Sequence, residues 1–206
     1  LNDLINLTKD KKVLLIHGSG SIHSNGCYDD IKEAISKGNG ELIEFKNASN
    51  EINDIKKGIS IAKEKKVELI IGAGGATVMD ASKFIAFGNF HPDFEHYIRG
   101  ENTSKMKRLP LILIPTYPSS GTELGTYSVS FNSNTKEFGA ICGITADYAI
   151  LVPKYSLSLS PELTIYTCLV TFVQLSICVI GDKNPISYDQ GISVIKNVIK
   201  ATNLLK

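Results

Sequence analysis

The chain has 206 residues, enough for one large domain or one and a half with a substantial core. Apolar residues make up 43%, charged residues 21% and the net charge is +1, a balance typical of soluble globular proteins that predicts neither a nucleic-acid nor a membrane partner. The polar N-terminus LNDLINLTKDKK excludes a secretory signal, and the nearest apolar stretch, 165–180, carries Thr and Gln and is too short for a bilayer span. None of the four cysteines forms a CxxC pair, so we expect reduced thiols and a cytoplasmic location.

The first 88 residues alternate short apolar runs, typical of buried strands, with segments of helical apolar spacing. This βαβαβα order predicts an α/β fold with parallel strands and helices on both faces. Right-handed crossovers place the carboxyl ends of all strands on one edge, where open α/β sheets bind ligands. The expected strands and helices, in chain order, are 13–16, 28–36, 42–45, 50–65, 67–71 and 77–88.

The remainder of the chain divides near Pro161, a residue that suits the first turn of a helix. Before it we expect a loop with a short helix, then strands and a hairpin. After it the pattern is all helical, and an apolar stripe with two cysteines (168, 169, 172, 173, 177 and 178) reads as core. We therefore predict an α/β domain over 1–157 and the beginning of a helical domain over 158–206. The expected elements are the loop 89–107, strands 109–115, 127–131, 138–141 and 148–151, and helices 161–180 and 187–205.

The stretch VELIIGAGGATVMDASK, residues 67–83, joins a strand to a helix through a glycine-rich turn at 72–75. Glycines let the backbone approach a bound group, and the first turn of the helix then offers free N–H groups to a phosphate. The spacing of Gly72, Gly74 and Thr77 misses a G-x-G-x-x-G by its last glycine. A phosphate cradle and an ordinary tight turn both stay open on spacing alone, and Asp80 could likewise serve only the helix dipole.

Four segments together resemble the iron-containing (group III) alcohol dehydrogenases, and most closely their butanol-dehydrogenase-like branch. They follow one another in the order and at the spacing of that family. The resemblance implies a Rossmann-like parallel-sheet domain that binds NAD or NADP, a helical domain that holds iron or zinc, and a homodimer. The segments are VLLIHGSGSIHSNG (13–26), residues 67–83, LILIPTYPSSGTE (111–123) and AILVPKYSLSLSPELT (149–164).

The same resemblance implies the cofactor contacts. The pyrophosphate loop GGGSxxD corresponds to residues 74–80, with alanine and threonine replacing the third glycine and the serine, and TGSE corresponds to residues 120–123. NADP-preferring members carry GGGS where this chain has residues 18–21; the small residues leave room for the 2′-phosphate, so we favour NADP over NAD. The implied cofactor residues are Gly18, Ser19, Gly20, Ser21, Gly74, Gly75, Ala76, Thr77, Asp80, Thr116, Ser120 and Thr122.

The family's metal ligands are not matched. Its DxxxH pair, one helical turn apart, falls on Val170 and Gln174, and residues 161–205 contain no histidine. Valine offers no ligand atom, and a neutral amide oxygen is a weak substitute for imidazole. We therefore predict no catalytic residue and no bound iron or zinc.

Three functions follow from these residues. The first is an NADP-linked oxidoreductase of the iron-type alcohol dehydrogenase family, moving a hydride between nicotinamide and a primary alcohol or aldehyde. The second is a non-catalytic dinucleotide-binding or interaction module, either a degenerate family member or a fragment of a longer one. The third is a relative of glycerol dehydrogenase or dehydroquinate synthase, which share the architecture.

Overall fold

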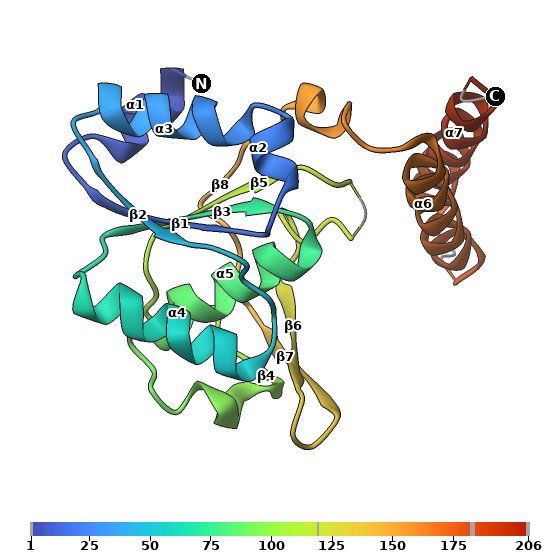
Figure 1. Cartoon of the computed structure of the whole chain (residues 1–206). Helices are drawn as coiled ribbons and strands as arrows, with labels where there is room; N and C mark the ends of the chain where they lie inside the picture. Colours follow the sequence, from blue (N-terminus) through green and yellow to red (C-terminus); the bar gives the residue numbers. More distant parts are fainter. Residues whose placement is uncertain (1, 119, 182–183, 205–206) are drawn as a thin grey trace. The chain divides into compact units, whose positions relative to one another are not determined.

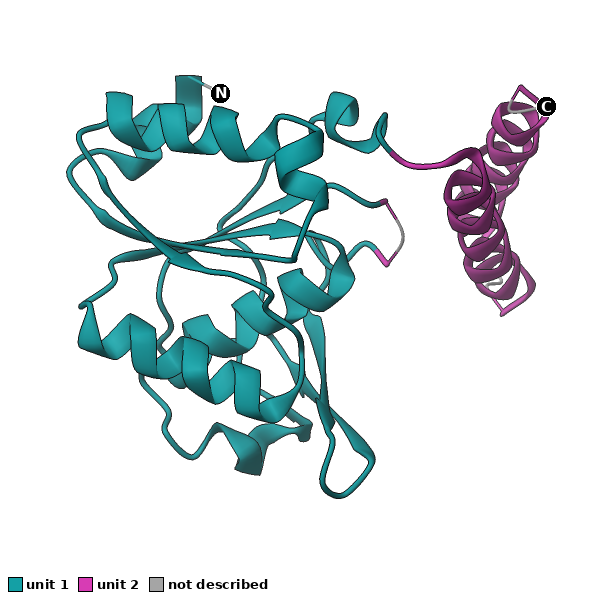
Figure 2. Ribbon diagram, viewed as in Figure 1, with its two compact units in different colours: residues 1–117, 121–158 teal, residues 118–120, 159–206 magenta. Residues whose placement is uncertain are grey.

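The computed structural model describes residues 2–118, 120–181 and 184–204. It divides into two compact units, drawn in different colours in Figure 2. Unit 1 comprises residues 1–117 and 121–158, and unit 2 comprises residues 118–120 and 159–206. The chain passes from one unit to the other after Ser158, one residue beyond the end of the predicted α/β domain.

Unit 1 is built on a five-stranded sheet in the order β2-β1-β3-β5-β8, with every neighbouring pair parallel. This confirms the predicted α/β class. The central strands β1, β3 and β5 are largely apolar because helices cover both faces, so neither face needs polar side chains. Their bounds are β1 (Lys12–His17), β2 (Glu41–Phe45), β3 (Leu69–Gly74), β5 (Leu111–Pro115) and β8 (Tyr148–Ala149).

Helices cover the two faces of this sheet as separate layers (Figure 1). The helices α1 (Asn2–Thr8), α2 (Ser21–Ser24) and α3 (Cys27–Lys37) lie on one face, and α4 (Ile52–Glu64) and α5 (Ala76–Gly88) lie on the other. Alternate residues of β1 serve the two cores: Leu15 packs in the cluster of Ile31, and Leu14 in the cluster of Phe84. That alternation is what a strand between two layers requires.

A smaller sheet of order β4-β7-β6 completes unit 1. The strands β6 (Tyr127–Asn132) and β7 (Glu137–Cys142) form the predicted antiparallel hairpin. The region expected to be a loop with a short helix contains the 3-10 helix η1 (Phe94–Tyr97) and an unforeseen strand, β4 (Arg99–Asn102). The sequence RGEN of β4 is exposed at every residue, so it carries no apolar signal. A second 3-10 helix, η2 (Pro153–Ser156), follows β8.

Unit 2 consists mainly of two long helices that pack on each other, α6 (Pro161–Gly181) and α7 (Pro185–Asn203). The structure corrects the expected burial of the α6 stripe: Leu169 is 56% exposed, Ile177 is 67% exposed and Cys178 is also exposed. Within the described part of unit 2, α7 covers only one side of α6. The helix was therefore predicted correctly, but the described residues do not bury its apolar stripe.

The length of α6 also corrects the expectation that no segment could span a bilayer. It has 21 residues, and an 18-residue window within it has a mean hydropathy of 2.1, which is sufficient by length and composition to cross a membrane. A single helix of this kind is weak support for a membrane segment, because apolar core helices pass the same test.

The ion pair between Arg108 and Asp147 anchors the start of β5. Two nitrogens of Arg108 donate to the two carboxylate oxygens of Asp147 at 2.7 and 2.8 Å, and the Leu111 N–H donates to Asp147 Oδ2 at 2.8 Å. Burial alone would raise the pKa of Asp147, but these hydrogen bonds outweigh it and hold the pKa below its usual value of 3.8.

We expect Asp147→Asn to lower the free energy of unfolding by about 1 kcal/mol at pH 7, after discounting for the partial exposure of the pair. Because the folded-state pKa is lowered, this stabilisation is present above about pH 4 and is lost as the pH falls through the folded-state pKa. Urea unfolding at pH 7 and pH 3 measures both effects. The control is Glu33→Gln, which breaks an ion pair with Lys37 that is 60% exposed on both sides and should change little. An equal loss in both variants would contradict the expectation.

Candidate functional site

The strands β1, β3 and β5 end side by side, and their following loops gather at one edge of the sheet. Ile16 pairs with Gly72, and Gly74 pairs with Pro115, so the three carboxyl ends are level. The Ser21 and Thr116 hydroxyl oxygens lie 3.5 Å apart, and the Thr116 N–H donates to the Gly74 carbonyl at 3.0 Å. The expectation that the glycine-rich segments share this edge is confirmed.

The glycine-rich segment 72–75 contains fewer turn residues than predicted. Gly72 and Gly74 belong to β3 rather than to a turn, because their backbones pair with neighbouring strands. Gly75 is the N-cap of α5, which begins at Ala76. Strand and helix are therefore joined through a single residue, so the free N–H groups of the first helical turn face the sheet edge. Ala76 is helical and needs no positive φ, so alanine is compatible with this position.

Small and polar residues line this edge on the β1 side as well. Ser19, Gly20 and Ser21 are exposed, and Gly18 is half-buried. A Cβ atom added at Gly18 would meet only Val78 Cγ2, at 3.8 Å, which is an ordinary contact. The loop after β1 is accordingly open to a ligand and tolerant of a larger side chain.

Among the predicted cofactor residues, Asp80, Thr116 and Thr122 have buried side chains instead of lying open at the edge. Asp80 is 7% exposed and its Oδ2 accepts a hydrogen bond from the Val129 N–H at 3.2 Å. Burial raises the pKa of Asp80, and hydrogen bonds from Val129 and Thr122 partly offset that rise. Ser120 belongs to the other compact unit. Direct cofactor contacts by all of the predicted residues stay predictions.

Sequence reasoning gave no role to the polar cluster that supports Gly18. His17, at the end of β1, is 1% exposed; its Nδ1 lies 2.7 Å from the Gly18 carbonyl oxygen and its Nε2 lies 3.8 Å from Glu44 Oε2. Tyr28 donates to Glu44 Oε1 at 2.7 Å. Burial would raise the pKa of Glu44, but hydrogen bonds from Tyr28 and Lys46 keep it lowered. No local pattern signals this cluster, since it depends on β2 lying beside β1.

The residues of α6 at the family's metal positions do not fit iron or zinc. Val170 is 42% exposed and presents only hydrocarbon, and Gln174 is exposed with a neutral amide. Among the residues that the structure describes, no three His, Cys, Asp or Glu side chains gather in a way that could hold a metal ion.

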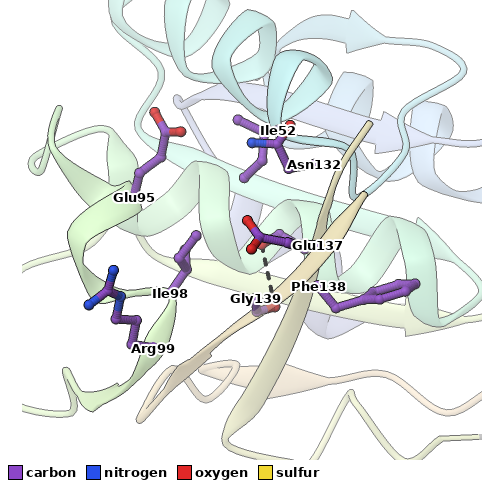
Figure 3. Close-up of a pocket in the computed structure, with 9 residues that line it drawn as sticks. Ile52, Glu95, Ile98, Arg99, Asn132, Glu137, Phe138 and Gly139 are labelled. Atoms are coloured by element: carbon purple, nitrogen blue, oxygen red, sulfur yellow. Dashed lines mark hydrogen bonds between the residues drawn. The ribbon is translucent and has the colours of Figure 1, made fainter. Parts of the chain in front are cut away.

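A separate cavity of about 480 Å³ lies between η1, β4 and the β6–β7 hairpin. Figure 3 shows the side chains that surround it, with Glu95 and Arg99 on one side and Glu137 and Phe138 on the other. None of the predicted cofactor residues lines it. The cavity is thus distinct from the glycine-rich edge.

Comparison with known proteins agrees with this geometry. The family model described as iron-containing alcohol dehydrogenase matches residues 1–153. The chain is 30% identical over 161 residues to NADH-dependent butanol dehydrogenase A of Clostridium acetobutylicum, covering 74% of this chain and 40% of that protein. It is 26% identical over 160 residues to the NADPH-dependent aldehyde reductase YqhD of Escherichia coli, covering 74% of this chain and 41% of that protein.

The solved structures extend the likeness to the helical unit. The NADH-dependent butanol dehydrogenase A of Thermotoga maritima is 25% identical, with a TM-score of 0.89 over 100% of this chain and 53% of its own. This chain spans about two fifths of the length of the curated relatives it matches. The matched family model, the relatives and the fold agree, and the chain belongs to the iron-containing alcohol dehydrogenase family, on its butanol-dehydrogenase-like branch.

Proposed function

We propose that unit 1 is the dinucleotide-binding part of an NAD(P)-linked alcohol or aldehyde oxidoreductase. The observation that carries the proposal is the convergence of the loops after β1, β3 and β5 at one edge, where Ser21, Gly74 and Thr116 are neighbours. The names of the relatives support it, since they include NADH-dependent and NADPH-dependent enzymes that act on butanol or aldehydes. In this proposal unit 2 is the beginning of the substrate domain.

The residues of this edge divide the work of holding a dinucleotide. The N-terminus of α5 attracts the pyrophosphate, and Gly75 lets the phosphate oxygens approach the backbone because no side chain intervenes. The exposed Thr77 hydroxyl is available as a further donor. We assign a ribose contact to the Ser21 and Thr116 hydroxyls, whose oxygens lie 3.5 Å apart. The bound nicotinamide would supply the hydride, and these residues hold and orient it.

The preference for NADP over NAD is part of the proposal. The relatives include both kinds of enzyme, so it depends on the small residues from Gly18 to Ser21, which leave room for a 2′-phosphate. Isothermal titration calorimetry with NADPH and NADH tests the proposal directly. Binding of neither at millimolar concentration would contradict it.

The variant Gly18→Asp should reverse this preference. Its carboxylate would repel the 2′-phosphate and accept hydrogen bonds from the ribose hydroxyls, so we expect NADPH affinity to fall by about tenfold or more relative to NADH. The position has room for the side chain. The matched control is Gly18→Asn, which has the same shape without the charge. Equal effects of Asp and Asn on the ratio of the two affinities would contradict the assignment of this loop to the 2′ position.

A second function, a dinucleotide-binding module without metal-dependent catalysis, is favoured by Val170 and Gln174 at the metal positions. It differs from the first in turnover and not in cofactor binding. A relative of glycerol dehydrogenase or dehydroquinate synthase is less favoured than either, because the matched family model and relatives are alcohol dehydrogenases. The cytoplasmic location and the homodimer stay predictions from the sequence.

A further inference from the structure

Lys83 is a buried cation that the proposed function does not use. It lies on α5 with 0% exposure, and its Nζ donates to the carbonyl oxygens of Gly125 at 2.7 Å and Tyr127 at 3.1 Å. Burying an ammonium group is costly, and an apolar side chain would fill the same space more favourably. A lysine here therefore needs an explanation beyond packing.

The same side of α5 carries Asp80, one helical turn earlier. Besides the bond from the Val129 N–H to its carboxylate, the Asp80 backbone carbonyl accepts the Ser128 hydroxyl at 2.9 Å. The Thr122 side chain also hydrogen-bonds the Asp80 carboxyl. Asp80 and Lys83 together fasten α5 to the chain between residues 122 and 129.

The segment that Asp80 and Lys83 hold is the turn that contains Thr122 and leads into β6. The Gly121 carbonyl accepts the N–H groups of Leu124 at 3.1 Å and Gly125 at 2.9 Å, so the turn is compact. Lys83 holds the carbonyls at the end of this turn. The helix α5 starts at the proposed phosphate site. The two hydrogen bonds from Lys83 therefore set the distance between that site and Thr122.

We propose that Lys83 is a positioning residue of the cofactor site, which fixes the turn bearing Thr122 relative to the N-terminus of α5 through the Gly125 and Tyr127 carbonyls. This inference rests on the proposed dinucleotide binding. It assigns Lys83 no contact with the cofactor itself.

The charge on Lys83 should make the strength of its two hydrogen bonds depend on pH. Asp80 and Glu123 are the charged groups that act on it, and burial lowers the pKa of Lys83 to about 8 despite their attraction. Charged donors form stronger hydrogen bonds than neutral ones. The hydrogen bonds from Lys83 to the two carbonyls should therefore weaken as the pH rises through about 8.

The experiment compares Lys83→Met with the wild-type chain by hydrogen exchange and by calorimetric titration with NADPH and NADH. We expect faster exchange across residues 121–129, unchanged exchange in β1, and affinity for the preferred dinucleotide reduced about tenfold. The wild-type affinity should fall between pH 7 and pH 9, whereas that of Lys83→Met should not. The matched control is Ser82→Ala, a buried neighbour whose hydroxyl donates only within α5, to the Val78 carbonyl at 2.8 Å.

The outcomes distinguish the proposed dinucleotide binding from the proposed role of Lys83. Wild-type protein that binds neither dinucleotide overturns the proposed function. Wild-type binding together with unchanged affinity and exchange in Lys83→Met, or an equal loss of affinity in Ser82→Ala, overturns only the role of Lys83. If Lys83→Met does not fold, the wild-type pH profile decides: a fall above pH 8 supports the inference, and a flat profile refutes it.

Discussion

The purified chain, supplied with NADPH, an aldehyde and Fe²⁺ or Zn²⁺, is expected to turn over at least about 10³-fold more slowly than the roughly 10 s⁻¹ of an ordinary enzyme. In the family to which this chain belongs, the metal polarises the substrate oxygen as a Lewis acid. Val170 cannot ligate a metal, and Gln174 offers only a neutral oxygen. We therefore expect added metal not to restore turnover, even when the dinucleotide binds.

Metal content and NADPH consumption measured on the same sample test this result. A useful partner variant is Val170→Asp with Gln174→His, which rebuilds an acid and an imidazole one helical turn apart. Both positions are exposed, so the substitutions disturb no core. We expect this variant to gain measurable zinc affinity over the parent chain. Stoichiometric metal and ordinary turnover in the unmodified chain would contradict the prediction.

The second large effect is expected at Gly72, in the centre of the sheet. A Cβ atom there would lie 2.3 Å from Ser82 Oγ and 2.9 Å from Leu113 Cδ2. The absence of a side chain at Gly72 thus lets α5 lie close against β3. The strand β3 itself lies between β1 and β5, which cannot move apart. We expect Gly72→Val to lower the free energy of unfolding by about 3 kcal/mol or more, since overpacking a rigid core forces backbone shifts.

The neighbouring Gly75 provides the control for that measurement. A Cβ atom at Gly75 would lie 3.7 Å from Tyr117 Cβ, and φ is −83°, so Gly75→Ala should change the stability by less than about 1 kcal/mol. Urea unfolding of both variants gives the comparison. A Gly72→Val variant as stable as Gly75→Ala would show that helix and strand can separate without cost.

Secondary structure was predictable where apolar periodicity is strong. The strands β1, β2, β3 and β5 and the helices α3, α4 and α5 were expected from the sequence within a few residues of their observed bounds. The helix α1 was not predicted, and it buries only Leu4 and Thr8. Two further misses have a similar cause. The strand β4 is fully exposed and α2 is only four residues long, so neither contains enough buried side chains to produce a period.

The candidate site was predictable to a similar extent. Glycine-rich segments after strands, together with the rule that parallel strands end on one edge, predicted that the loop at Gly18 and the turn before α5 would meet. The strand status of Gly72 was missed, since glycine-rich sequence reads as a turn when its pairing partners are unknown. The direction of the Asp80 side chain could not be predicted from the sequence either, because its partner, Val129, is 49 residues away along the chain.

The sequence by itself determined the α/β class, the family and the absence of metal ligands at positions 170 and 174, because these depend on residue types and spacing along the chain. Only the tertiary structure decided that Asp80 and Lys83 face β6, that His17 and Glu44 support Gly18, and that the apolar stripe of α6 lies exposed. The reason is physical: burial and hydrogen-bond partners are set by the strand order and by which layers cover a helix, and neither is encoded in a local pattern.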